Sequence, residues 1–288
     1  MRYQPNFAKL KSVWADEIIQ YLEERQKSGF EIDAAFYHIK HLDRYCEQIG
    51  LKEKIFTDEM AFDIKLKLSG ESGSNRYGRV SETIRFLQYL RNKGYDVHIP
   101  PPISTKNIKK YPPYIYTYEE LANYMNAVDT FDYGFHKLDS LIMPVFFRLI
   151  YCYGLRISEV KYLRKKDIDF KNKVIKISKS KNGKERWLPM SIDIERLLSL
   201  YAKKTFFFIR DDTFIFNCEL NTGKNHIDPH NASIYRYHYE FLRLAGIHNK
   251  DAESQRPRIH DFRHTAAVHI VKQLSDKGYD VYTLKVGS

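Results

Sequence analysis

Residues 258–265 read Arg258-Ile259-His260-Asp261-Phe262-Arg263-His264-Thr265 and open an apolar segment with helical spacing. His260 and Arg263 are three positions apart, so a helix places both side chains on one face. An imidazole beside a guanidinium at a helix N-terminus suits an anion, most naturally a phosphate group. We therefore expect cations from elsewhere in the chain to reach the same anion.

The composition favours a folded protein with a polyanionic partner. The chain has 288 residues, of which 43% are hydrophobic and 15% aromatic, enough for two domains of ordinary size. Lys and Arg number 47 against 36 Asp and Glu, which gives a formal net charge of +11. Basic surface attracts phosphates and releases counterions on binding, although many basic proteins bind no nucleic acid.

Cysteine usage and hydropathy indicate a soluble protein of a reducing cytoplasm. The three cysteines (Cys46, Cys152 and Cys218) are far apart and odd in number, which argues against a disulfide framework. No Cys-x-x-Cys pair offers a structural zinc site. The first residues lack an apolar signal core, and no apolar run approaches the length of about eighteen residues that a membrane helix needs.

Residues 1–97 are expected to form a helical domain. Apolar residues recur at helical spacing in four segments: Ala8 to Lys27, Asp33 to Ile49, a shorter one after Thr57-Asp58, and Asn75 to Lys93. The last of these also carries a charged face that includes Arg76 and Arg79. Such a face is usually only solvated; contact with DNA is the functional alternative.

Residues 98–113 are expected to link two domains. Three consecutive prolines at 100–102 cannot continue a helix and favour an extended, semi-rigid segment. Lys106, Lys109 and Lys110 make this linker basic. It therefore either passes along a DNA backbone or acts only as a spacer.

Residues 114–288 are expected to form a mainly helical domain with a small antiparallel sheet. Helical spacing predicts helices after the capping box Thr117 to Glu120, over Leu138 to Tyr153, from about Ser158, over Ile192 to Lys203, over Ala232 to Leu244, and up to Leu274. Period-two alternation predicts strands at Val174 to Ile177 and at Trp187-Leu188, joined by the turn Asn182-Gly183. A short apolar strand is expected from Phe214 to Phe216.

Two further sites in this domain supply cations. Arg156 lies between two apolar helices, cannot easily reach solvent, and so needs an anion, which is either Glu159 or a ligand. Lysines cluster at the hairpin turn, at Lys179, Lys181 and Lys184. Lysines at turns are usually solvated, but one here could also deliver a proton to a leaving oxygen.

A zinc site is the main rival for the segment at 258–265. His260 and His264 are four positions apart, as in a metalloprotease helix, but that motif needs a glutamate where Asp261 stands. Arg263 would also repel a dication, and no third ligand is evident. We therefore expect neither a metal nor a cofactor. The cations instead form a metal-free donor set for a phosphorane-like transition state.

Three motifs together resemble the tyrosine recombinases, also called the phage integrase family. Gly154 to Glu159 resembles the first arginine box, Lys181 to Pro189 the lysine hairpin, and His260 to Thr265 the His-x-x-Arg box. The resemblance covers nearly the whole chain. It implies a helical core-binding domain, a linker, and a mixed catalytic domain that is mostly helical with a small sheet.

The resemblance also implies a role for each motif residue. Arg156 and Arg263 would clamp the nonbridging oxygens of a scissile DNA phosphate, and Lys181 would protonate the leaving 5′-oxygen. His260 would act as hydrogen-bond donor or base, and Glu159 would support the site from behind. The implied partner is double-stranded DNA, with four protomers in the synapse of the full-length form.

The chain departs from the family pattern after the His-x-x-Arg box. The family continues with a His or Trp in a Gly-His context and then the nucleophilic tyrosine, and neither occurs before Ser288. Tyr279 and Tyr282 precede the position of the missing motif, so we expect no nucleophile in this chain. The chain is expected to be cut just before that motif, and to bind DNA without cleaving it.

Three functions stay open from the sequence. The first is a site-specific recombinase or integrase of a mobile element, which joins strands through a 3′-phosphotyrosyl bond. The second is a naturally shortened relative that occupies recombination sites as a regulator; an in-frame Gly-His and tyrosine beyond Ser288 would favour the enzyme. The third is a generic helical DNA-binding protein in which alanine at Arg156 has little effect.

Overall fold

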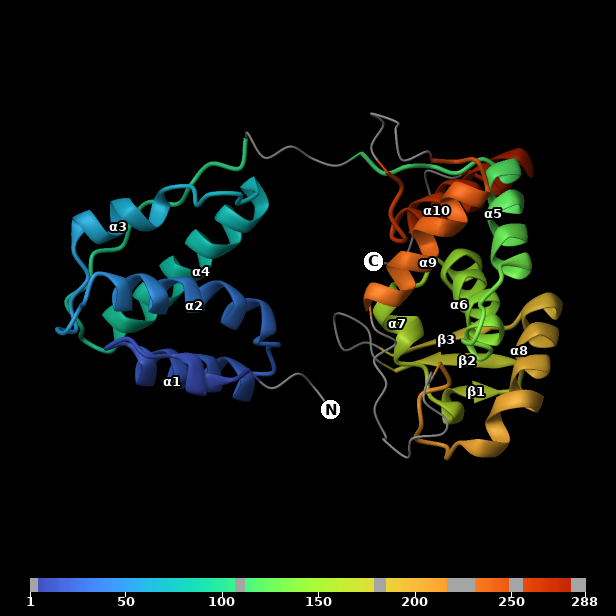
Figure 1. Ribbon diagram of the computed structural model, residues 1–288, viewed down its shortest axis with the longest axis horizontal. Coiled ribbons are helices and arrows are strands. Elements are labelled where there is room, and N and C mark those ends of the chain that lie inside the picture. The colour runs from blue at the N-terminus through green and yellow to red at the C-terminus, as the bar shows by residue number, and fades with distance from the viewer. Residues whose placement is uncertain (1–4, 107–111, 179–184, 217–230, 249–255, 281–288) are drawn as a thin grey trace. The chain divides into compact units, whose positions relative to one another are not determined.

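The computed structural model describes residues 5–106, 112–178, 185–216, 231–248 and 256–280 (Figure 1). The chain forms two compact units, Met1–Tyr111 and Pro112–Ser288. Each unit has a hydrophobic core of its own. No helix within the described ranges combines the length and the apolar character needed to cross a membrane.

The described part of unit 1 contains four α-helices, as the apolar spacing predicts. They are α1 (Ala15–Lys27), α2 (Asp33–Gln48), α3 (Asp58–Lys65) and α4 (Gly73–Asn92). Side-chain caps fix where α3 and α4 begin, because the hydroxyls of Thr57 and Ser72 accept hydrogen bonds from backbone N–H groups three residues later. The side chains of Trp14, Phe86 and Leu87 fill the centre of this bundle.

Helix α1 begins later than its apolar spacing predicts. A short 3-10 turn, η1 (Phe7–Lys9), stands where the helix was expected to start. The buried carboxylate of Asp43 on α2 accepts hydrogen bonds from the backbone N–H groups of Lys11 and Ser12 at 2.9–3.1 Å. These groups therefore have a tertiary partner in place of a helical one, which local periodicity cannot reveal.

Unit 2 is mainly helical. Its described helices are α5 (Tyr118–Thr130), α6 (Asp139–Tyr153), α7 (Ile157–Lys161), α8 (Ile192–Thr205), α9 (Asn231–Leu244) and α10 (Asp261–Asp276), with 3-10 turns η2 (Lys165–Asp167) and η3 (Phe206–Phe208). Helix α6 contacts α5, α7, α8 and α10, so it is the central helix of this unit. Figure 1 shows the sheet and α8 toward the opposite end of unit 2 from α10.

The small sheet has three antiparallel strands in the order β1-β2-β3. They are β1 (Ile168–Asp169), β2 (Val174–Ile177) and β3 (Arg186–Pro189). The register pairs Val174 with Pro189 and Ile177 with Arg186, so β2 and β3 pair as the hairpin pattern predicts. The turn at 179–184 lies outside the described residues. Strand β1 is too short to have shown a periodic pattern.

The prediction of a strand from Phe214 to Phe216 is wrong. Phe214 makes only an isolated bridge to Arg164, and Ile215 donates its N–H to the carbonyl of Leu163. Ile215 and Phe216 are buried in the main core of unit 2. Their apolar character therefore reflects burial of a single extended segment, which periodicity alone does not distinguish from a strand.

Aromatic side chains from distant segments orient α10. Phe262 in its first turn is buried, stacks on Tyr116 with ring centroids 4.6 Å apart, and meets Tyr124 edge to face at 4.9 Å. The hydroxyl of Thr265 accepts a hydrogen bond from the backbone N–H of Tyr116 at 3.1 Å. These contacts fix one side of α10 against the core and so set the direction in which Arg263 leaves the helix.

Candidate active site

The junction between α6 and α7 holds Arg156 in place. Gly154 ends α6 in the left-handed conformation, with φ 57° and ψ 35°, which a glycine adopts without the cost that a side chain adds. The backbone then turns sharply, and Arg156 becomes the N-cap residue of α7. The carboxylate of Glu159 accepts the backbone N–H of Arg156 at 2.9 Å, which closes the first turn of the new helix.

Glu159 is the centre of a cluster of three arginines. Its side chain is only 1% exposed. The guanidinium of Arg156 donates to it at 3.1 Å, and Arg186 on β3 donates twice, at 3.1 and 2.8 Å. Arg263 on α10 approaches to 3.9 Å. A buried carboxylate is thus compensated from its own helix, from the sheet and from the last described helix.

Arg186 and Arg156 dominate the ionisation of Glu159. Burial by itself raises the pKa of this carboxyl, but the hydrogen bonds from Arg186 and from the backbone and side chain of Arg156 outweigh it. The pKa therefore lies below its ordinary value, and Glu159 is a carboxylate at neutral pH. Three positive groups against one negative group leave the cluster with surplus positive charge.

Arg263 connects α10 to the end of α6. Its guanidinium donates to the carbonyl of Gly154 at 2.6 Å, across 109 positions of sequence. Its side chain is 34% exposed, so part of the guanidinium faces solvent. Partial burial and the neighbouring charge of Arg156 lower the pKa of Arg263 from its ordinary value, but the guanidinium stays protonated at neutral pH. This crowding of like charges is relieved when an anion binds between them.

His260 is the N-cap residue of α10 and is exposed. Its ring meets that of His264 edge to face, with centroids 5.0 Å apart. Partial burial, followed by the charges of His264, Arg263 and Arg258, lowers the pKa of His260. The imidazole is therefore mainly neutral at pH 7, the form that can accept a proton or donate a neutral hydrogen bond.

A buried histidine holds the segment that leads into α10. His238 on α9 is fully buried, which lowers its pKa to about 4, so the ring is neutral. The carbonyl of Pro257 lies 3.1 Å from Nε2 and can only accept, so Nε2 carries the proton. Nδ1 then accepts from the hydroxyl of Tyr124 at 2.8 Å. This chain of hydrogen bonds fixes the backbone three residues before His260.

Comparison with known proteins identifies the family. Residues 116–283 match the phage integrase family. The chain belongs to this family. The match confirms the resemblance that the three motifs predict.

Individual relatives and solved structures agree with this family. Over 276 residues the chain is 26% identical to tyrosine recombinase XerA of Thermococcus onnurineus, covering 94% of this chain and 84% of that protein. A lambda integrase tetramer bound to a Holliday junction is similar with TM-score 0.61 and 16% identity, covering 96% of this chain and 80% of that chain. The Tn1549 transposon integrase in complex with transposon right end DNA gives TM-score 0.60 and 17% identity, covering 92% and 88%. These structures establish the predicted fold, mainly helical with a small antiparallel sheet.

The predicted site residues of this member of the phage integrase family fall into two groups. Arg156, Glu159 and Arg263 meet in one cluster, and His260 lies one turn from Arg263 along α10. The hairpin lysines Lys179, Lys181 and Lys184 and the linker lysines Lys109 and Lys110 lie outside the described residues. Lys106 is exposed at the end of the described part of unit 1.

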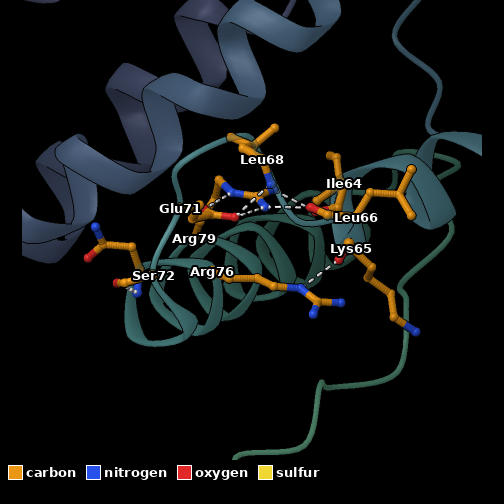
Figure 2. Close-up of polar contacts among 9 residues, drawn as sticks. Ile64, Lys65, Leu66, Leu68, Glu71, Ser72, Arg76 and Arg79 are labelled. Carbon is orange, nitrogen blue, oxygen red and sulfur yellow. Dashed lines mark hydrogen bonds and ion pairs between the residues drawn. The ribbon is translucent and has the colours of Figure 1, made fainter. Parts of the chain in front are cut away.

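Arg79 is not at the surface, contrary to the expectation that it contacts DNA. Its guanidinium donates to both carboxylate oxygens of Glu71, at 2.7 and 2.8 Å, and to the carbonyls of Ile64 and Leu66, as Figure 2 shows. The side chain is 5% exposed. Arg76 uses its Nε for the carbonyl of Lys65 but is only partly buried. Arg79 is thus a structural residue that fastens the end of α3, whereas Arg76 keeps donors at the surface.

Two residues of the site were missed from the sequence. Arg186 belongs to a recognised motif, but its partner Glu159 is 27 positions away and no local pattern links them. His238 lies on an amphipathic helix, where a histidine looks like any other polar residue. Its isolated position in an aromatic-rich segment was the one available signal, and that signal is weak.

Proposed function

We propose that this protein is a site-specific DNA recombinase or integrase of a mobile genetic element. In a chain of the phage integrase family, the observation that carries the proposal is the cluster of three half-exposed arginines around the carboxylate of Glu159. Such a cluster has surplus positive charge and fixed donors, which suit a phosphate. The similarity to a transposon integrase bound to transposon DNA supports the mobile-element context.

The proposed chemistry is transesterification at a DNA phosphate. Arg156 and Arg263 bind the two nonbridging oxygens and stabilise the charge that builds on them when the phosphorus becomes five-coordinate. Lys181 protonates the 5′-oxygen as its bond to phosphorus breaks, and neutral His260 donates a hydrogen bond or takes up a proton. A tyrosine attacks the phosphorus, so the strand is held as a 3′-phosphotyrosyl ester until a 5′-hydroxyl displaces it.

We propose that the 288-residue polypeptide itself binds DNA but does not cleave it. The Gly-His and tyrosine motif of the family does not follow the His-x-x-Arg box in this sequence. Tyr279 follows α10 with a side chain that is 61% exposed. Tyr282 lies outside the described residues. We assign the nucleophile to neither.

The proposed partner is double-stranded DNA, bound by both units. Arg76, Lys106, Lys109 and Lys110 are the proposed phosphate contacts of unit 1 and the linker, and Lys179 and Lys184 those of the hairpin. The overall charge of +11 supports binding to a polyanion. The similar lambda integrase is a tetramer on a Holliday junction, which supports a tetrameric synapse for the full-length recombinase. We propose that it acts in the cytoplasm.

Two measurements test the proposal. The first is duplex binding against salt concentration, where the logarithm of the binding constant should fall linearly and steeply with the logarithm of salt. A flat response contradicts DNA binding. The second uses a nicked suicide substrate that carries the matching recombination site. A covalent adduct with the 288-residue chain would contradict binding without cleavage.

A regulator that occupies recombination sites is the second candidate. Under this proposal the chain competes with an active recombinase for the same site and lowers the yield of recombinant product. Unchanged product yield at saturating amounts of the chain would exclude this role.

A further inference from the structure

Arg186 grips Glu159 more completely than the two arginines of the proposed phosphate clamp do. Its Nη1 donates to Oε1 at 3.1 Å and its Nη2 donates to Oε2 at 2.8 Å, a bidentate pair. Arg156 touches the same carboxylate with a single guanidinium nitrogen at 3.1 Å. Arg263 approaches only to 3.9 Å and hydrogen-bonds a carbonyl instead. Within this cluster, therefore, the fork of Arg186 is the one that faces Glu159 with two donors.

Because Glu159 is buried, it matters which arginine compensates its negative charge. A carboxylate that is 1% exposed cannot rely on water and must be compensated by nearby cations. Without Arg186, compensation would fall to Arg156 and Arg263. An arginine that pairs with Glu159 is less available to a phosphate. The transition state of the reaction at that phosphate carries more negative charge than the ground state and so needs these arginines more.

We propose that Arg186 is a positioning residue of the recombinase site. It neutralises Glu159 and thereby leaves the guanidinium groups of Arg156 and Arg263 available to a DNA phosphate. This inference rests on the proposed function. Arg186 also opens β3, the strand that follows the lysine segment, and so ties that strand to the helix that begins after Arg156.

A matched ion pair elsewhere in unit 2 provides the control. Arg148 on α6 donates to both oxygens of Asp129 at 2.8 and 2.6 Å, also as a bidentate pair. Its side chain is 26% exposed, comparable to the 35% of Arg186. The difference is that Asp129 is 44% exposed and is shared with no second arginine in the ion pairs of the described residues. Loss of Arg148 should therefore affect only its local packing.

The experiment measures the affinity of the full 288-residue chain for a labelled random-sequence duplex at fixed salt. The variants are Arg186→Gln, Glu159→Gln, the double variant and Arg148→Gln. We expect Arg186→Gln to weaken binding on the order of tenfold, the loss of one charge-assisted contact. The double variant should recover most of the affinity, because no buried carboxylate then competes for Arg156 and Arg263. Arg148→Gln should bind like the wild type.

A pH series separates positioning from simple support of the fold. The charged groups that face Glu159 are Arg156 from its own helix, Arg186 from β3 and Arg263 from α10. Removing Arg186 leaves burial as the larger influence on the pKa of Glu159, so the carboxyl takes up a proton at higher pH. The affinity of Arg186→Gln relative to the wild type should therefore improve as the pH falls. The double variant should lack this trend.

The outcomes distinguish this inference from the proposed function. If the wild type binds the duplex and Arg186→Gln binds equally well, the inference alone is wrong. A double variant as weak as Arg186→Gln also overturns it, since Arg186 would then act directly on DNA or only on folding. If Arg186→Gln does not fold, Arg186→Lys serves instead, with a smaller loss that Glu159→Gln again reverses. A wild-type chain that does not bind DNA contradicts the proposed function.

Discussion

Glu71 in unit 1 and Glu159 in unit 2 both bind arginine, but the two sites leave different surfaces. Glu71 accepts two hydrogen bonds from Arg79 and a third from the backbone N–H of Leu68, and the other hydrogen bonds of Arg79 go to backbone carbonyls. All three nitrogens of that guanidinium donate within the fold, and the side chain is 5% exposed. Glu159 instead collects three guanidinium groups, each 34–36% exposed.

The difference separates a structural arginine from one that can serve a ligand. An arginine whose donors all have partners inside the protein contributes to stability and has nothing left for a phosphate. A cluster with more cations than its carboxylate can neutralise keeps charge and donors at the surface. Sequence shows that an arginine is present, but only its partners decide which kind it is.

The largest expected effect comes from breaking the Glu71 site. Arg79→Met leaves Glu71 buried without its cation and the carbonyls of Ile64 and Leu66 without their donors. We expect unit 1 to lose about 3–5 kcal/mol of unfolding free energy in urea titrations. Lys93→Met, which removes an exposed pair with Glu24, is the control and should change stability far less than Arg79→Met. Equal losses in both variants would contradict the structural role of Arg79.

The second effect tests the neutral His238, which holds the segment that leads into α10. Burial lowers the pKa of His238 to about 4 from 6.5. Between pH 6.5 and pH 4, His238 therefore binds a proton in the unfolded chain but not in the folded chain. Its contribution to the free energy of unfolding is present above pH 6.5 and is lost as the pH falls toward 4. The loss should reach about 3 kcal/mol. Urea unfolding at several pH values measures it, and His238→Gln, which does not titrate, should show a smaller slope.

The third effect concerns the Glu159 cluster and should reverse the pattern seen for Arg79. Arg156→Ala should weaken duplex binding on the order of tenfold, about 1.4 kcal/mol, because a charged phosphate contact is lost. Stability should fall less than for Arg79→Met, because Arg186 still compensates Glu159. Fluorescence anisotropy and thermal melting on the same samples measure both quantities. A variant that melts early yet binds DNA normally would place Arg156 with the structural arginines.

The smallest effect compares neighbouring arginines of α4. Arg76→Ala should lower the slope of log affinity against log salt by about one, as expected for a single phosphate contact, with only a few-fold loss of affinity. Its stability should stay near that of the wild type, since one backbone carbonyl is the partner it loses. An unchanged salt slope would remove Arg76 from the proposed DNA interface.

Local patterns predicted much of the fold. Helix α5 begins where its capping box lies, and β2 pairs with β3 as the hairpin pattern predicts, because both signals are encoded in nearby residues. The start of α1 depends on Asp43, more than thirty positions away, and so was placed too early. The apolar run at Ile215 and Phe216 resembles a strand because both residues pack into the core of unit 2, which the local sequence does not show.

The sequence predicts those residues of the site that belong to recognisable motifs. Arg156, Glu159 and Arg263 were expected together from the family resemblance, and they meet in one cluster. The prediction that Arg79 contacts DNA is wrong because Arg79 is three positions from Arg76 on a helix, and this spacing suggests that both belong to one charged face. Its partners Glu71, Ile64 and Leu66 lie in a preceding segment whose path the sequence does not give.

The hydrogen bond between Arg263 and the carbonyl of Gly154 has a consequence for synthesis. It spans 109 positions, and the contact of Thr265 with Tyr116 spans 149. Chains emerge from the ribosome from the N-terminus onward, so unit 1 can fold before any arginine of the cluster has been made. The cluster is complete only after α10 has been made, so the proposed phosphate site forms late in synthesis.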